Sequence, residues 1–171
     1  AKDRPVWAAC RSLIDVNESQ TGLAIRLEDK VAQLSLTLDI GLLPSGVLRQ
    51  QLALTNQGRG DVAVQRLACT LPVASHFVER MGFYGRWCQE FQQERSDWQE
   101  QQGELVGAHL AWSGNHRLKA DYTVEGHRYL QAEAMYLPGE IVLATNETLS
   151  TPELLASHSS VGLNTMSQSF H

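Results

Sequence analysis

The sequence lacks the features that define several classes of protein. No apolar run approaches the roughly 20 residues needed to cross a bilayer, so no membrane-spanning segment is predicted. Basic residues are outnumbered, 14 against 19 acidic ones, and the net charge of −5 argues against a nucleic-acid-binding surface. Three widely spaced cysteines, Cys10, Cys69 and Cys88, predict neither a disulfide framework nor a zinc site. Free thiols suit a reducing cytoplasm, and the start, Ala1-Lys2-Asp3-Arg4-Pro5, has no signal-peptide core behind it.

Constellations of catalytic residues are also missing. The six histidines form no i, i+4 pair and no His-x-His pair, so no metal site is predicted. No Gly-x-Ser-x-Gly elbow and no phosphate-binding glycine loop occurs, so no serine hydrolase chemistry and no cofactor is implied. The acidic residues show no spacing that selects a pair for glycoside hydrolysis, and we expect them to be solvated surface groups; they include Glu79, Glu90, Glu94, Asp97, Asp121 and Glu133.

What the sequence does contain is a period of two. Residues 34–40 alternate leucine or isoleucine with polar residues, which predicts a strand with one dry face. Residues 42–46 predict a turn, and a second alternating run over 48–55 completes an antiparallel hairpin. With 171 residues and 43% hydrophobic content, the chain suits one domain spanning 1–171.

The second half of the chain repeats this pattern. Residues 105–112 form a nearly continuous apolar run, which predicts a strand covered on both faces with Trp112 in the core. Leu118, Ala120, Tyr122 and Val124 then alternate with polar residues. Many short strands with regularly spaced turns predict an all-β, antiparallel sandwich.

Two segments depart from strand periodicity. Residues 88–98 carry apolar residues at helical spacing, although an extended structure is the alternative that we favour. At the end of the chain, Leu163, Met166 and Phe170 fall on one helical face, which predicts a short C-terminal helix. Because that face has no expected partner within this chain, we predict that these three residues dock against a following domain.

Aromatic and arginine residues are the candidates for ligand contact. Trp87 lies in a glycine-punctuated stretch, Gly82-Phe83-Tyr84-Gly85-Arg86-Trp87, and could equally pack inside or stack on a sugar ring at an interface. Arg86 and Arg95 could clamp a carboxylate or a hydroxyl-rich ligand, or form ordinary surface ion pairs.

Several short motifs together resemble one family. Taken in order, they are similar to the N-terminal β-sandwich domain of bacterial α-galactosidases of glycoside hydrolase family 36. The matching segments are Leu52-Ala53-Leu54-Thr55-Asn56-Gln57-Gly58, Leu71-Pro72-Val73, Gly85-Arg86-Trp87-Cys88-Gln89-Glu90 with Glu94-Arg95, Trp112-Ser113-Gly114-Asn115, Leu137-Pro138-Gly139-Glu140, Thr151-Pro152, and the terminus from Gly162 to His171.

This resemblance implies a fold and a supporting role. The fold would be a galactose-mutarotase-like β-supersandwich beside a catalytic (β/α)8 barrel, and residues 1–171 would be a fragment of the N-terminal domain of a larger enzyme. That enzyme would hydrolyse terminal α-galactosides with retention of configuration, and family members are often tetramers. Since the catalytic aspartates belong to the barrel, which is absent, the chain would pack on the barrel and support oligomerisation without catalytic residues of its own.

The sequence departs from the family pattern in two places, and two other functions are considered. The family's loop after its Glu-Arg element is shortened here at residues 96–102, and its earlier N-terminal region does not precede Ala1, so no substrate-contacting residue is transferred. The runner-up hypothesis is an independent carbohydrate-binding sandwich; a complete small enzyme is disfavoured because no catalytic constellation is present. Galactosyl transfer in place of hydrolysis stays open for the parent enzyme.

Overall fold

The chain folds as an all-β sandwich with one short helix. The computed structural model describes residues 12–77, 80–86, 89–96 and 104–170. Its largest layer is an antiparallel seven-stranded sheet in the order β1-β2-β3-β4-β14-β9, with β13 also pairing with β4. The strands are β1 (Ser12–Glu18), β2 (Gly22–Asp29), β3 (Leu34–Leu42), β4 (Leu48–Asn56), β9 (Leu105–Leu110), β13 (Thr148–Ser150) and β14 (Leu154–Ser159).

The predicted hairpin lies at the centre of this sheet. Leu36 pairs with Leu54 and Leu38 with Leu52 across β3 and β4, as their alternation predicts. In the turn between the strands, Gly46 has a φ of 81°, a left-handed conformation that glycine adopts without a steric penalty. The hairpin is therefore confirmed in both its strands and its turn.

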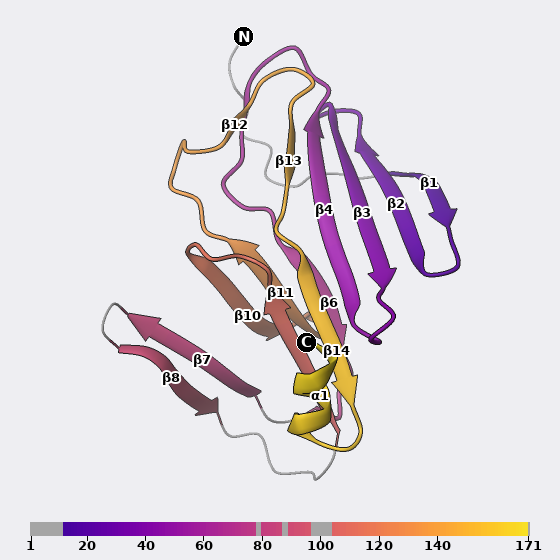
Figure 1. Cartoon of the computed structure of the whole chain (residues 1–171). Coiled ribbons are helices and arrows are strands. Elements are labelled where there is room, and N and C mark those ends of the chain that lie inside the picture. The colour runs from indigo at the N-terminus through magenta and orange to yellow at the C-terminus, as the bar shows by residue number, and fades with distance from the viewer. Residues whose placement is uncertain (1–11, 78–79, 87–88, 97–103, 171) are drawn as a thin grey trace.

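Three smaller sheets complete the fold (Figure 1). A three-stranded sheet has the order β10-β11-β6, and two further pairs join β12 to β5 and β7 to β8, all antiparallel. The strands are β5 (Val62–Ala63), β6 (Cys69–Val73), β7 (Arg80–Arg86), β8 (Gln89–Ser96), β10 (His116–Tyr122), β11 (Arg128–Ala134) and β12 (Val142–Leu143). Strand β8 confirms the extended alternative for residues 89–96 and overturns the helical one, whereas Cys88 and Trp98 lie outside the described residues.

The hydrophobic core fills the space between the two main sheets. Side chains from the inner face of the seven-stranded sheet meet residues of β6, β11, β12 and the segment after β5. Leu154 and Cys69 are fully buried, and burial of each such side chain stabilises the fold by roughly 1.5–3 kcal/mol. The buried cluster consists of Leu36, Leu52, Leu54, Val64, Leu67, Cys69, Leu110, Ala132, Leu143 and Leu154.

Buried Asn56 fixes the loops at one end of the core. Its amide nitrogen donates to the carbonyls of Gly60 and Leu143, at 2.8 and 2.9 Å, and its side-chain oxygen accepts from the backbone N–H of Gly58 at 2.9 Å. A side chain with no exposed area would be costly without such partners, and all of its polar atoms have one. Asn56 thus holds the loop after β4 against the loop after β12.

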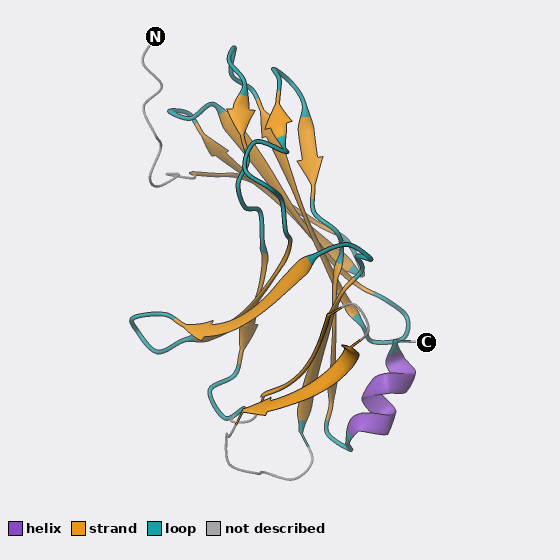
Figure 2. Ribbon diagram, turned by 90° about the vertical axis from the view of Figure 1, so that its left-hand side faces the viewer, coloured by secondary structure: helices purple, strands orange, loops and turns teal. Residues whose placement is uncertain are grey.

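The predicted C-terminal helix is present as α1 (Leu163–Ser169), with Phe170 as its C-cap. It packs against β9 and β14 on the face of the sheet opposite the β10–β11 hairpin, which projects from the body of the molecule (Figure 2). A helix of seven residues is too short to be stable alone in water, so this packing sustains it.

Trp112 corrects one expectation. β9 ends at Leu110, so Trp112 lies beyond the strand and is 47% exposed, outside the core. Its indole lies over Gly114, where an added Cβ would come within 2.5 Å of Nε1. The prediction that both faces of this strand are covered is also wrong, because His109 and Val106 are exposed and Leu110 alone in the strand is buried. The sequence pattern did not show where the strand would end.

Candidate functional site

The predicted ligand-contacting residues lie on the β7–β8 hairpin, and its register separates them. Arg86 pairs with Gln89 beside the turn, whereas Arg95 pairs with Met81 near the open end. Six residues of strand between positions 89 and 95 span about 20 Å, so the two arginines lie at opposite ends of the hairpin backbone. Their role in contacting a ligand stays a prediction. Trp87 lies outside the described residues.

The predicted docking residues lie on α1 or at its end. An added Cβ at Gly107 would fall 2.5 Å from the sulfur of Met166, so the helix approaches β9 closely at this glycine. Ser169 Oγ lies 2.6 Å from Ser157 Oγ of β14 and fixes the other end of the helix. The helix therefore has a partner within the chain, contrary to expectation, because a glycine and a serine leave room for it on the sheet.

This docking leaves part of the helix surface available. Met166 and Phe170 are only half-buried against the sheet. Leu163 is the first residue of α1, and the docking role predicted for the three residues stays a prediction.

A buried carboxylate is the most constrained charged group of the described chain. Glu133 of β11 is only 3% exposed. Arg66 Nε donates to one of its oxygens at 2.9 Å, and Arg117 donates from Nε at 2.6 Å and from its terminal nitrogen to the other oxygen. Burial raises the pKa of Glu133, but the two arginines outweigh burial, and the net effect lowers the pKa below its ordinary value.

Glu133 therefore corrects the expectation of a solvated surface acid. Its two neighbours in sequence, Ala132 and Ala134, face the core, while its own side chain points to the opposite face of the sheet and is covered there by Arg66 and Arg117. A charged residue between two small apolar ones in a strand is the only signal that the sequence offers for this burial. With both oxygens engaged, the carboxylate is a structural group.

A second carboxylate joins two histidines that are distant in sequence. His76 Nε2 lies 2.8 Å from one oxygen of Glu104, and His158 Nε2 lies 2.7 Å from the other. The hydrogen bond with His158, together with that from His76, lowers the pKa of Glu104. All three side chains are about half exposed. Sequence reasoning missed the cluster because its members are 28 and 54 residues apart.

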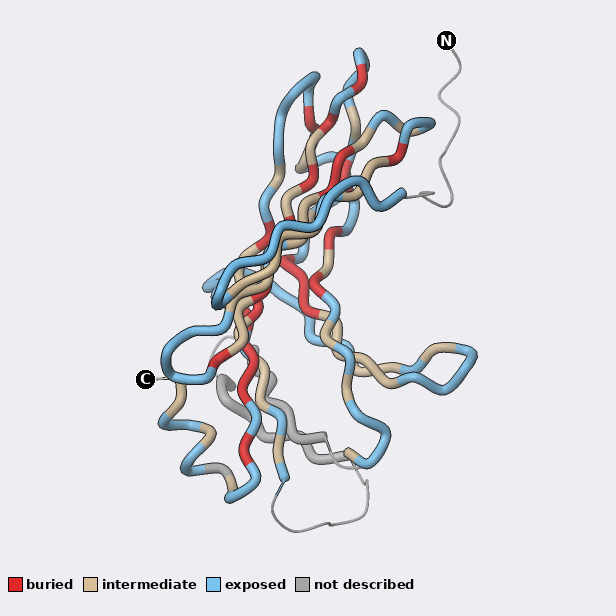
Figure 3. Tube along the Cα trace, turned by 90° about the vertical axis from the view of Figure 1, so that its right-hand side faces the viewer, coloured by how far each residue is buried: buried red, intermediate tan, exposed pale blue. Residues whose placement is uncertain are grey.

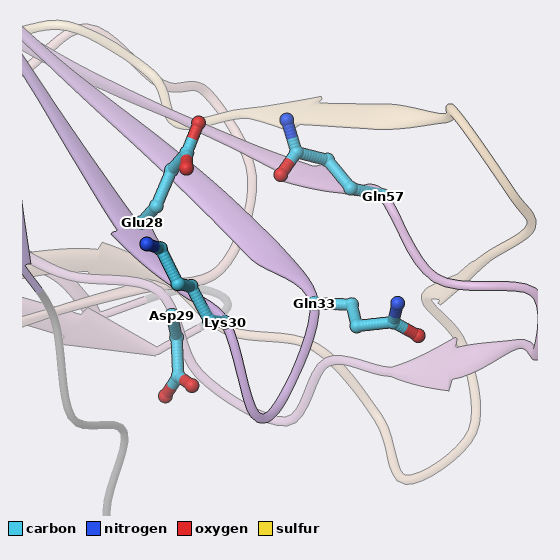
Figure 4. A pocket seen from close by; sticks show the side chains of 5 residues that line it. All are labelled: Glu28, Asp29, Lys30, Gln33 and Gln57. Atoms are coloured by element: carbon cyan, nitrogen blue, oxygen red, sulfur yellow. The ribbon is translucent and has the colours of Figure 1, made fainter.

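A polar pocket lies at the turn between β2 and β3 (Figure 4). Its volume is about 310 Å³, and it is lined by Glu28, Asp29, Lys30, Gln33 and Gln57. The carboxylate of Asp29 accepts the backbone N–H groups of Val31 and Ala32, both at 2.9 Å, so it stabilises the turn. Because the lining contains no aromatic or aliphatic side chain, the pocket offers a sugar ring little apolar surface.

Metal-binding clusters and membrane-spanning helices are both missing from the described residues. Across the described part of the chain, no three His, Cys, Asp or Glu side chains converge as a metal site. The described residues also include no helix of the length and apolar character that a bilayer requires.

Comparison with known proteins places this geometry in a family. The family model described as the glycosyl hydrolase family 36 N-terminal domain matches residues 11–100. An α-galactosidase of Escherichia coli is 41% identical over an alignment 187 positions long, gaps included. The alignment covers 92% of this chain and 26% of that protein. The chain thus spans about a quarter of that curated relative.

Solved structures agree in fold. The α-galactosidase AgaB of Geobacillus stearothermophilus matches 96% of this chain and 30% of its own, with a TM-score of 0.73 and 16% identity. The galactosidase domain of an α-galactosidase–sucrose kinase matches 88% of this chain and 25% of its own, with a TM-score of 0.70 and 22% identity. At these identities the likeness concerns the fold.

Proposed function

This chain belongs to the glycosyl hydrolase family 36 N-terminal domain family, and from that premise we propose that it is the non-catalytic domain of an α-galactosidase. The parent enzyme would hydrolyse terminal α-galactosides, and this domain would pack on the catalytic domain of the same polypeptide and support a homo-oligomer. The observation that carries the proposal is the extent of the match, because 92% of the chain aligns with only a quarter of an α-galactosidase.

The charges of the chain support a non-catalytic role. A glycosidase needs two carboxyl groups facing one sugar, and in a retaining enzyme they lie roughly 5–5.5 Å apart. The described chain has two buried acids with other roles. Asp29 stabilises a turn, and Glu133 forms ion pairs with two arginines. Neither is placed to protonate or attack a glycosidic bond.

The apolar surface near α1 supports docking. Met166 and Phe170 keep part of their surface open, and Val161, just before the helix, is 74% exposed. Large apolar side chains left open beside a marginal helix are typical of an interface. The free, buried thiol of Cys69 supports a reducing compartment, so we place the protein in the cytoplasm.

The test is hydrolysis of a chromogenic α-galactoside by the longer polypeptide that carries this domain, with the 171-residue chain as control. We expect activity in the former and none in the latter. Val161→Asp, at a 74% exposed residue beside α1, should weaken docking in the longer polypeptide and lower its thermal midpoint, whereas Val31→Asp, at an 89% exposed turn residue, should not. Activity of the chain alone, or an inactive longer polypeptide, would contradict the proposed function.

A further inference from the structure

Strand β10 presents an open edge on the projecting hairpin. Within the described residues it pairs with β11 alone. At one end of the ladder Thr123 N–H donates to His127, and at the other Met135 N–H donates to Asn115. Because hydrogen-bonded pairs alternate along antiparallel strands, the odd-numbered residues bond to β11. The even-numbered residues Leu118, Ala120 and Tyr122 therefore direct their backbone N–H and C=O groups outward, and the N–H of Tyr122 donates to Asp121 Oδ1 at 2.9 Å.

Three other edge strands carry features that hinder pairing, and β10 carries none of these features. Strand β1 is interrupted by a bulge between Leu13 and Asp15, β9 has α1 packed against it, and β6 contains Pro72. The register of β6 with β11 directs the nitrogen of Pro72 to the free edge, where proline removes a donor. In contrast, β10 pairs with β11 without a bulge over all seven residues and contains no proline. Natural proteins seldom leave such an edge uncovered.

The side chains of β10 add an apolar and a charged face to this edge. Leu118 is 42% exposed and Tyr122 72% exposed, and both lie on the face that continues into the core at Ala132. Lys119 and Asp121 lie on the opposite face, with Nζ and Oδ2 2.5 Å apart. The hairpin extends beyond the seven-stranded sheet, which explains why these apolar groups stay open (Figure 3).

The pattern of charges is complementary to itself in one register. If two β10 strands run antiparallel with Ala120 opposite Ala120, Lys119 of each strand faces Asp121 of the other and Leu118 faces Tyr122. A register centred on Lys119 would oppose two lysines, and one centred on Asp121 would oppose two aspartates, both unfavourable. In the favoured register the outward groups of three residue pairs form about six backbone hydrogen bonds. Two of these require the N–H of Tyr122 in each copy to exchange Asp121 Oδ1 for a carbonyl of the partner strand.

We propose that two copies of this chain associate through β10, antiparallel and centred on Ala120, and so join their three-stranded sheets into one six-stranded sheet. The inference deepens the oligomer-forming part of the proposed function and rests on it. It names the surface, the register and the partner, which is a second copy of the same chain.

The test is sedimentation equilibrium of the 171-residue chain and charge variants across a concentration series. Lys119→Asp and Asp121→Lys each place like charges opposite one another, and each should lower the association constant at least about tenfold. The double swap Lys119→Asp with Asp121→Lys restores both cross-strand pairs and should return the constant to within about threefold of the unaltered chain. Arg59→Asp makes the same charge change at an exposed loop residue and should have no effect.

Two proline variants distinguish a loss of association from a loss of folding. Ala120→Pro removes an outward N–H and should abolish association while the circular dichroism spectrum is kept. Lys119→Pro removes an N–H that bonds to β11 and should destabilise the hairpin. Hydrogen exchange should show the amides of Leu118 and Ala120 protected only at concentrations where the chain associates.

Several outcomes would overturn the proposal. A chain that stays monomeric, single charge variants that associate normally, or a double swap that fails to recover would each do so. Association of this chain but not of the longer polypeptide would also overturn it, since a segment of the same polypeptide would then cover the edge. None of these readouts depends on galactoside hydrolysis, so a failure here is distinguishable from a failure of the proposed function.

Discussion

Glu133 and Glu104 are both carboxylates held between two basic side chains, and they differ in burial. Glu133 is 3% exposed and is bound by Arg66 and Arg117, whereas the side chain of Glu104 is 46% exposed and is bound by two histidines. In the buried site the two half-exposed arginines both bind the carboxylate and cover it from water, so it depends on them for its hydrogen bonds. In the exposed site water competes with both histidines, and the cluster joins segments without stabilising the fold appreciably.

The largest effect should follow removal of both arginines. Arg66→Ala with Arg117→Ala removes the charge-assisted hydrogen bonds of both arginines to Glu133, and we expect a loss of about 3–5 kcal/mol in the free energy of unfolding. Urea denaturation at pH 7 measures it. The control is Arg26→Ala with Arg49→Ala, which removes two exposed ion pairs and should cost below about 1 kcal/mol per pair. Equal losses in the two double variants would contradict the comparison.

A smaller effect is expected for Glu133→Gln. The amide keeps a hydrogen-bond acceptor but loses the charge, so the free energy of unfolding at pH 7 should fall by about 1–3 kcal/mol. Because the folded pKa of Glu133 is lowered, its contribution is present above the pKa of an unfolded glutamate, about 4.3, and is lost as pH falls through the folded pKa. The difference between variant and unaltered chain should therefore close in acid, and a constant difference down to pH 3 would argue against the ion pair.

Glu104→Gln should hardly change global stability at neutral pH. Its urea midpoint should differ from that of the unaltered chain by no more than the midpoint of the control Arg26→Ala with Arg49→Ala does. The local effect should be faster amide exchange at the start of β9, where the carboxylate joins the loop before β7 to β14. Because the pKa of Glu104 is lowered, any contribution from it also disappears as pH falls through that pKa. A midpoint loss comparable to that of Glu133→Gln would mean that exposure does not decide the strength of these clusters.

The smallest effect should distinguish the two histidines. The hydrogen bond with His158 is the largest influence on the pKa of Glu104, ahead of that with His76. The carboxyl pKa, followed by NMR, should therefore rise further in His158→Ala than in His76→Ala. The reverse order would show that the two hydrogen bonds have been ranked wrongly.

Local periodicity predicted the parts of the fold that adjacent residues decide. The hairpin of β3 and β4 followed from alternation and a glycine turn, and α1 followed from the spacing of Leu163, Met166 and Phe170. The strands β1 and β2 were not identified. All residues of β1 are exposed, and an edge strand with little burial carries a weak alternating signal.

Long-range contacts decided what the sequence could not show. Strand β14 pairs with β4 and β9, segments that lie far apart in the chain, and only this pairing brings His158 to Glu104. The alternation of Leu118 and Tyr122 was real, but whether that face is covered depends on how far the opposing sheet extends. Trp112 was misplaced for the same reason, since hydrophobicity does not reveal where a strand leaves the sheet.

The fully buried thiol of Cys69 gives the molecule an internal reporter of its own opening. Burial is the strongest influence on the pKa of this thiol and raises it. The sulfur lies 3.4 Å from Thr151 Oγ1, between the two sheets. A thiolate is the species that reacts with alkylating reagents, so Cys69 should react only during excursions that part the sheets. In a variant with Cys10 and Cys88 replaced by serine, the alkylation rate therefore reports the population of the open state, and it equals the opening rate when alkylation outpaces reclosing.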